Sequence, residues 1–146
     1  MRHWRRVVLT GAAGYLASWF LPAYIAPGKS FGVEGYRAFL AAVLSAFFVN
    51  HESPRFAIML FVSAATNTLF LALPLAMPGR AVTSRRFLAW LYGGAFLVNG
   101  CWLLWEPLVP LMGFSVWWLS FATVAIGLFL SESEGSISLK ENGVAV

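Results

Sequence analysis

The stretch Gly79-Arg-Ala-Val-Thr-Ser-Arg-Arg86 is the one strongly charged break in the long apolar middle of the chain. It separates two hydrophobic halves, each of them too apolar for a soluble domain of this size. Arginines that follow an apolar span favour the border between lipid and water, where the guanidinium group stays hydrated. The break therefore predicts the end of one membrane span and the start of the next.

Composition agrees with this interpretation. The chain is 60% hydrophobic and 16% aromatic, only 11% of its residues are charged, and it contains no aspartate. An ordinary soluble domain carries roughly 25% charged residues. We therefore predict an integral membrane protein. At about 20 residues per spanning helix, its 146 residues leave room for one domain of at most about five spans.

The apolar runs predict the fold class, an all-α integral membrane bundle. Four runs are expected to be transmembrane helices, over residues 7–26, 56–77, 87–105 and 109–130. The apolar core of segment 36–50 is shorter, in the range where a re-entrant or interfacial helix is expected. Residues 1–130 then form a single domain, and the polar segment 131–146 is expected to be a disordered tail. The alternative is five transmembrane helices, with segment 36–50 also crossing.

The arginines favour four spans, because positively charged loops stay on the cytoplasmic side of a membrane. With four spans, the arginines that precede the first run and those of residues 79–86 all face the cytoplasm. With five spans, one of these two clusters lies outside in either orientation. We predict a multi-pass protein of the cell inner membrane with a cytoplasmic amino terminus. The alternative of a cleaved signal peptide is disfavoured, because cleavage after Ala26 would place bulky Tyr24 where a small residue is needed.

Four spans would gather most of the remaining ionisable residues at the outer face, around the short helix. This candidate polar rim consists of Glu34, Arg37, His51, Glu52, Arg55 and Glu106. Such groups can bind a metal, transfer protons or hold a phosphate. Their spacing selects none of these roles, because His51 and Glu52 are adjacent and no second histidine lies near them. We expect a solvated ring of charges, with Arg37 and Glu106 as a structural pair, and neither a metal nor another cofactor.

Two amides, Asn67 and Asn99, lie well inside predicted spans. An unpaired amide is costly in hydrocarbon, so we expect them to form hydrogen bonds between helices. The alternative is a conduction or substrate site. Small residues recur at helical spacing in the spans and predict close helix packing, either within the bundle or in a homodimer. They include Gly11, Gly14, Ser18, Ala64, Thr68, Gly93, Gly94, Ser120 and Gly127.

Several of the seven tryptophans fall near the predicted span ends, as expected for aromatic belts at the two membrane surfaces. These are Trp4, Trp90, Trp102 and Trp105. The adjacent pair Trp117 and Trp118 is also expected to anchor the protein, with a stacking platform for a lipid or quinone as the alternative.

Motifs of common enzymes are missing from the sequence. It contains no HExxH, CxxC, Gly-x-Ser-x-Gly or P-loop pattern, and no Asp, Glu, Lys or Arg inside a predicted span. Ion-coupled transporters usually need such a buried charge. We predict a non-enzymatic protein, an accessory subunit or immunity-type protein that binds another membrane component. The alternative is a small transporter or lipid-binding membrane protein. Nucleic acid is not an expected partner, because no basic helix or basic patch is present.

Three segments resemble a pattern found in small uncharacterised polytopic bacterial inner-membrane proteins. They are Ser18-Trp-Phe-Leu-Pro-Ala-Tyr24, Gly35-Tyr-Arg-Ala38 and Gly113-Phe-Ser-Val-Trp-Trp-Leu-Ser120. Where such proteins often have Asn-Pro in the middle span, this chain has Asn67-Thr68. The resemblance implies a bacterial membrane protein of four to five helices and carries no activity with it.

Overall fold

The computed structural model describes residues 3–25, 30–48, 54–76, 82–104 and 109–141, and this part of the chain is mostly helical. Its helices are α1 (His3–Ser18), α2 (Gly35–Phe48), α3 (Pro54–Asn67), α4 (Leu69–Ala76), α5 (Val82–Gly100) and α6 (Met112–Glu141), with a 3₁₀ helix, η1 (Cys101–Leu104). The strands are β1 (Pro22–Ile25), β2 (Gly32–Glu34) and β3 (Val109–Pro110).

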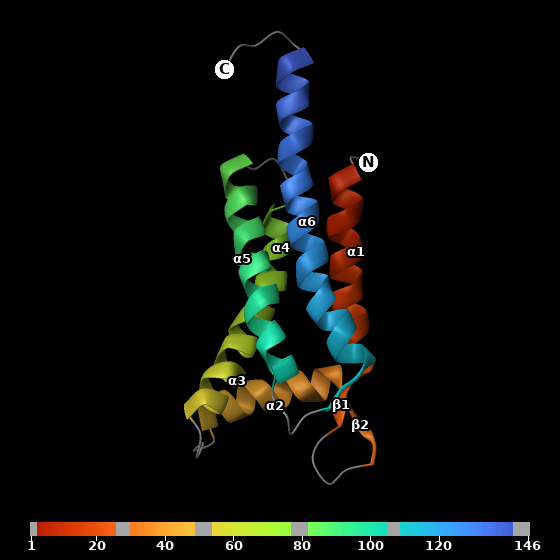
Figure 1. Ribbon diagram of the computed structural model, residues 1–146, viewed down its shortest axis with the longest axis vertical. Coiled ribbons are helices and arrows are strands. Elements are labelled where there is room, and N and C mark those ends of the chain that lie inside the picture. Colours follow the sequence, from red (N-terminus) through yellow and green to blue (C-terminus); the bar gives the residue numbers. More distant parts are fainter. Residues whose placement is uncertain (1–2, 26–29, 49–53, 77–81, 105–108, 142–146) are drawn as a thin grey trace.

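The long helices run side by side, and α6 packs against both α1 and α5 (Figure 1). Helix α2 lies across one end of this bundle and packs on α3. The start of α1, the start of α5 and the far end of α6 all lie at the opposite end. We call these the α2 end and the amino-terminal end of the bundle.

Two helices are long and apolar enough to cross a membrane, over Ser84–Leu104 and Met112–Ser131. Two shorter apolar helices cover Gly35–Leu44 and Ala57–Leu71. The first of these belongs to α2, which lies where the sequence predicts a short helix at 36–50. The prediction of four complete spans goes further than these lengths and stays a prediction.

The first helix is shorter than the predicted span 7–26, because α1 ends at Ser18. The amides of Trp19, Phe20 and Leu21 bond back three residues, in the tighter pattern that often ends a helix. Pro22 has no N–H to continue the helix and instead begins β1.

A small antiparallel sheet, not expected from the sequence, joins three helix ends at the α2 end. Strand β1 lies between β2 and β3. The chain entering α2 is fixed to the chain leaving α1 by the amide of Gly35, which donates to the carbonyl of Leu21 at 2.9 Å. Similarly, the amide of Leu111 donates to the carbonyl of Ala23 at 2.8 Å, which fixes the start of α6. Sequence patterns miss such pairing because the strands are very short and their partners lie far apart in the chain.

The predicted span 56–77 is divided in two at Thr68. Side chains just before the break compete for backbone carbonyls: Asn67 Nδ2 donates to the Ser63 carbonyl at 2.6 Å, and Thr68 Oγ1 donates to the Ala65 carbonyl at 2.6 Å. The amide of Thr68 also bonds to the Ala65 carbonyl, only three residues back. Such local bonds bend or interrupt helices.

The chain after the last predicted span also differs from expectation. The segment 131–146 was expected to be disordered, whereas α6 continues to Glu141. No proline follows Pro110, and extending a helix that is already formed costs far less than starting a new one. Residues 142–146 lie outside the described part of the chain.

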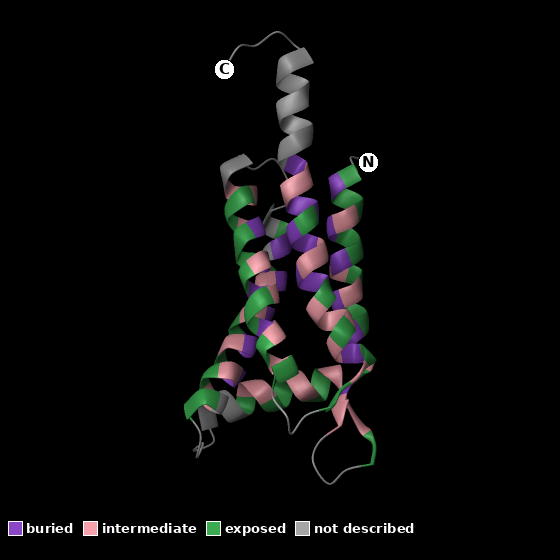
Figure 2. Cartoon of the chain, in the orientation of Figure 1, coloured by how far each residue is buried: buried purple, intermediate pink, exposed green. Residues whose placement is uncertain are grey.

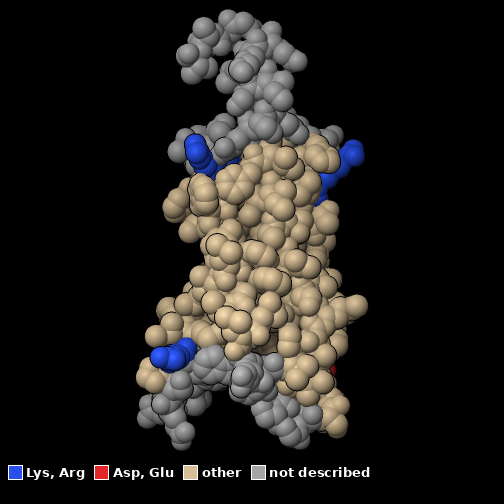
Figure 3. Space-filling view, viewed as in Figure 1, with Lys and Arg blue, Asp and Glu red and all other residues tan. Residues whose placement is uncertain are grey.

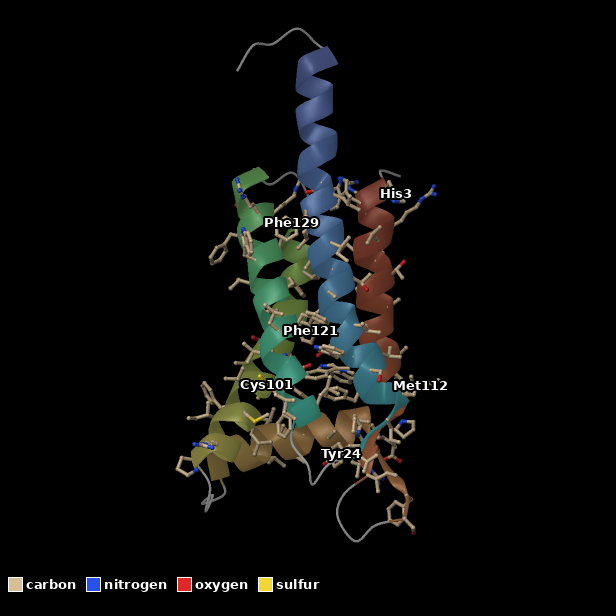
Figure 4. The ribbon with its side chains drawn as sticks, viewed as in Figure 1. His3, Tyr24, Cys101, Met112, Phe121 and Phe129 are labelled. Atoms are coloured by element: carbon tan, nitrogen blue, oxygen red, sulfur yellow. The ribbon has the colours of Figure 1, made fainter. Side chains whose placement is uncertain are left out.

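Aromatic rings fill the centre of the bundle. Phe70 of α4 stacks on Tyr15 of α1, with ring centroids 3.8 Å apart, and meets Tyr92 and Phe121 edge to face. Phe121 lies midway along the bundle (Figure 4). Buried residues lie on the sides of the helices that face this core, and exposed residues lie outside (Figure 2).

The small residues of α1 and α6 allow these two helices to approach closely. A Cβ atom on Gly127 would lie 2.6 Å from Val8 Cγ2, and one on Gly11 would lie 2.7 Å from Val124 Cγ2. The two glycines of α5 differ, because a Cβ on Gly93 or Gly94 would meet nothing within 4 Å. Close packing through small residues is therefore present between α1 and α6, and it is absent at Gly93 and Gly94 within the described structure.

The outer surface is strongly apolar along the length of the bundle. Leu71, Leu97 and Leu104 are 78%, 71% and 83% exposed. Figure 3 shows basic side chains near the two ends of the visible face and none across the band between them. Many other large apolar side chains are exposed on the helices, among them Phe87, Trp90 and Ile126.

Candidate functional site

A buried polar network joins α3, α5, η1 and α6, and its centre is Asn99 of α5. The Asn99 side chain is 1% exposed. Its Nδ2 donates to Thr66 Oγ1 and to the Ala95 carbonyl, both at 2.9 Å. Its Oδ1 accepts from Ser63 Oγ at 2.9 Å. Both amide N–H groups of Asn99 are thus paired, and the side chain bonds α5 to α3.

Two tryptophans extend this network. Trp102 Nε1 donates to Ser63 Oγ at 2.6 Å, and Trp117 Nε1 donates to Asn67 Oδ1 at 2.9 Å. The first bond joins η1 to α3, and the second joins α6 to α3. The expected hydrogen bonds between helices are therefore present at both asparagines.

A cavity of about 230 Å³ lies beside the network, at the α2 end of the bundle. Its walls come from α1, β1, α2, α3, η1, β3 and α6. Aromatic rings and small residues line most of it, including Trp19, Phe39, Phe114 and the alanines of α2. For comparison, an engineered apolar cavity of about 150 Å³ is large enough to bind benzene. The size and lining fit a small apolar molecule or the end of a longer one.

The polar part of the lining is small and lies mainly on α3. Ser63 and Asn67 both line the cavity, together with the rings of Trp102 and Trp117. Asn67 is 6% exposed, and its described bonds use one amide N–H and one lone pair of Oδ1. An amide has two N–H groups and two lone pairs. One donor and one acceptor of Asn67 are therefore not used by its described bonds.

Tyr24 of β1 adds a further polar group to the wall, and Figure 4 places it at the α2 end. Burial raises the pKa of its phenol above the ordinary value. The hydroxyl therefore stays neutral at physiological pH, so it brings no charge to the cavity.

The polar rim predicted from the sequence is only partly described. Arg37 Nε lies 3.4 Å from Glu34 Oε2 and donates to Tyr36 Oη at 2.9 Å. The bond to Tyr36 and the carboxylate of Glu34 raise the pKa of the Arg37 guanidinium. Arg37 was expected to pair with Glu106, but within the described residues its partner is Glu34. These side chains are exposed, and a pair of this kind contributes little to stability.

The other members of the rim do not form a described cluster. Arg55 lies near the start of α3, and its side chain is exposed. His51, Glu52 and Glu106 lie outside the described residues. Over the described ranges, no three His, Cys, Asp or Glu side chains come together to hold a metal ion.

The expected place in an aromatic belt is wrong for Trp4. Trp4 is 1% exposed and belongs to the core, and Trp102 donates its N–H to Ser63. Trp118 also bonds inward, from Nε1 to the Phe96 carbonyl at 2.7 Å. Trp90 is exposed, as a belt residue would be. Trp105 lies outside the described part of the chain.

Sequence reasoning selected the two asparagines but not the cavity. Ser63 could have been connected with Asn67, because residues four apart share one helix face. The alanines of α2 gave no comparable signal, since small residues in an apolar segment are typical of ordinary packing. Their place beneath the network depends on how α2 crosses the end of the bundle.

Comparison of the chain with known protein families, curated proteins and solved structures finds no match. The interpretation of the cavity therefore rests on its own geometry.

Proposed function

We propose that this protein is a membrane protein that binds an apolar molecule with one hydrogen-bonding head group. The observation that carries this proposal is the cavity of about 230 Å³, with its apolar walls and the two unused hydrogen-bonding positions of Asn67. This function is the lipid-binding alternative from the sequence. It is favoured over the accessory-subunit hypothesis because that hypothesis has no corresponding feature among the described residues.

The membrane part of the proposal is supported by the surface and the helix lengths. Two helices are long and apolar enough to cross, and the exposed residues between the charged ends are largely apolar. In the proposed arrangement α1, α3 with α4, α5 and α6 cross the inner membrane, while α2 lies along the outer surface. The amino terminus then faces the cytoplasm, because the arginines that begin α1 and α5 lie at one end.

The ligand is proposed to be an isoprenoid or acyl chain that ends in a hydroxyl or carbonyl. Its chain would contact the aromatic and alanine walls, while its head would bond to Asn67. A hydroxyl or carbonyl can use the remaining donor or acceptor of this amide without bringing a charge into the cavity. A charged head would be disfavoured, because the described part of the lining contains no opposite charge.

A fluorescence experiment tests the proposal. Bromine quenches indole fluorescence at short range, and Trp19, Trp102 and Trp117 all line the cavity. A brominated long-chain alcohol added to the purified protein in detergent is expected to quench this emission saturably. Ala42→Phe should abolish the saturable component, because the new ring would occupy the cavity. Asn67→Leu should weaken binding by about tenfold, the value of one well-formed hydrogen bond of about 1.4 kcal/mol.

Ala17→Phe is the matched control, because Ala17 is exposed on α1 and does not line the cavity. This variant should bind the alcohol as the wild type does. Quenching that rises linearly with probe concentration, and equally in all variants, would show partition into the detergent and contradict the proposal.

The hypothesis of an accessory or immunity-type protein stays a prediction, as does a homodimer. Purification in mild detergent tests both. A stable second protein in the purified sample would favour the subunit hypothesis, and a monomer with bound apolar molecules would favour the proposal above.

A further inference from the structure

The large side chains around the cavity at the α2 end are mostly aromatic. Among the described lining residues, Leu60 is the one leucine, and there is no isoleucine, valine or methionine. The other large apolar side chains carry rings and come from several elements of the fold. They are Trp19, Tyr24, Phe39, Trp102, Phe114 and Trp117. Such walls differ from the aliphatic lining that a plain acyl chain would need.

Some of these rings form pairs. Trp19, which follows α1, stacks on Phe39 of α2, with ring centroids 5.7 Å apart and ring planes 23° apart. The rings of Phe114 and Trp117 on α6 have centroids 5.5 Å apart. The face of an aromatic ring is negative, and ring pairs are stabilised beyond the burial of their area. A flat ring with electron-withdrawing carbonyl groups therefore gains more from these walls than a flexible chain, which also loses more conformational freedom on binding.

Two neutral hydrogen-bond donors line the cavity from separate elements. Asn67 of α3 has one amide N–H that its described bonds do not use. Tyr24 of β1 also lines the cavity, and its hydroxyl has no hydrogen-bond partner among the described residues. A ligand with two uncharged acceptor oxygens could therefore bond to both donors.

The cavity is large enough for such a ring and reaches the surface. Its volume is about 230 Å³, and about 150 Å³ is enough for benzene. Two lining residues, Ala41 of α2 and Pro110 of β3, are exposed as well. Their neighbours in the sequence, Leu40 and Val109, are 51% and 54% exposed. An apolar chain attached to the ring can leave the cavity past these residues.

We propose that the cavity binds the head ring of a quinone, with Asn67 Nδ2 donating to one carbonyl oxygen and Tyr24 Oη donating to the other. This inference rests on the function proposed above, because it assigns the head group of the same ligand. A straight-chain alcohol or ketone enters the same cavity but has a single oxygen and no ring. It therefore lacks the second hydrogen bond and the stacking.

Thermal unfolding of the full chain in detergent, followed by circular dichroism, tests the head group with three probes of matched length. Decyl-para-benzoquinone has the ring and both carbonyl oxygens, decylbenzene has the ring alone, and a straight-chain ketone has one carbonyl alone. A probe that binds the folded state raises the unfolding temperature in proportion to its affinity. The quinone is expected to bind the wild type about tenfold more tightly than either of the other two, as expected for an additional hydrogen bond.

Tyr24→Phe keeps a ring in the cavity wall and removes only the hydroxyl. It should weaken quinone binding by about tenfold, the effect of losing one hydrogen bond. Binding of the ketone should stay unchanged, because the ketone can still bond to Asn67. Tyr36→Phe is the matched control, because Tyr36 does not line the cavity and its hydroxyl accepts from Arg37. This variant should bind every probe like the wild type.

The results separate the quinone assignment from the function on which it rests. Quinone binding that is no tighter than ketone binding, or that is equally weakened in Tyr24→Phe and Tyr36→Phe, would overturn the assignment. So would an equal loss of quinone and ketone binding in Tyr24→Phe. The proposed function would remain if the ketone and the brominated alcohol still bind saturably, and it would fail as well if no probe does.

Discussion

The Asn99 side chain is important because it forms hydrogen bonds with several polar groups at once inside an apolar bundle. It accepts from Ser63 and donates to Thr66, so that α3 and α5 are joined by two side-chain bonds through one amide. Buried groups of this kind have no water as an alternative partner. Hydrogen bonds between membrane helices have been measured at only about 0.6 kcal/mol on average. The network therefore specifies how the helices meet more than it strengthens them.

Asn99→Leu is expected to lower the free energy of unfolding by about 1 kcal/mol, because Ser63 and Thr66 both lose a buried partner. Thermal unfolding in detergent, followed by circular dichroism, measures the change. The double variant with Ser63→Ala should lose less free energy of unfolding than the sum of the losses in the two single variants, because both single variants remove the same bond.

Thr123→Val is the matched control for Asn99→Leu. Thr123 Oγ1 donates only within its own helix, to the Leu119 carbonyl at 2.9 Å. This variant should change stability by no more than about 0.5 kcal/mol. Equal losses in the two variants would show that the bond between α3 and α5 contributes nothing specific.

At the level of the elements, the contact between α1 and α6 depends on glycines that leave no room for a side chain. Gly127 lies against Val8 and the Trp4 carbonyl, and Gly11 lies against Val124. Such close approach gives extensive van der Waals contact, which drives helix association where the solvent is itself apolar. The faces of α1 and α6 that could have joined two copies of the chain are thus used within one copy.

Gly127→Ala is expected to lower the free energy of unfolding by about 1–3 kcal/mol, the usual cost of overpacking. The added Cβ would lie 2.9 Å from the backbone nitrogen of Val8, which cannot rotate away as a side chain could. Gly94→Ala on α5 is the control, because its Cβ would meet nothing within 4 Å. That change should be neutral or raise stability by up to about 1 kcal/mol through helix propensity. The same unfolding measurement serves both, and the opposite order of stabilities would refute the packing described for α1 and α6.

At the level of the whole molecule, the order of the helices places three points of the chain at one end. They are the start of α1, the start of α5 and the far end of α6 (Figure 1). Such an arrangement is the one required if the chain crosses a membrane an even number of times between these points. Both arginine clusters then lie at the same end, as the four-span prediction requires.

Reporter fusions test this topology in cells. Fusions after Ser84 and after Val146 should both report the cytoplasm, and a fusion after Ser30, between β1 and β2, should report the outer side. A cytoplasmic reporter that is inactive after Ser84 would contradict four spans and favour five. The same result would contradict the proposed place of the cavity at the outer side of the membrane.

The sequence by itself determined the helical class, the apolar surface and the approximate place of most helices. These properties follow from composition and from runs of consecutive apolar residues, so they can be predicted without knowing how distant parts of the chain pack. It also selected Asn67 and Asn99, because a polar amide in an apolar helix must find a partner wherever that helix packs.

Only the tertiary structure determined which residues bond to the polar groups inside the bundle. The bonds from Trp102 to Ser63 and from Trp117 to Asn67 join residues 39 and 50 positions apart, and no local pattern encodes such distances. The same holds for the strands that turn the chain at Pro22, for α2 crossing the end of the bundle, and for the cavity that results. Packing places these residues together, because the energy of each contact depends on all the helices around it.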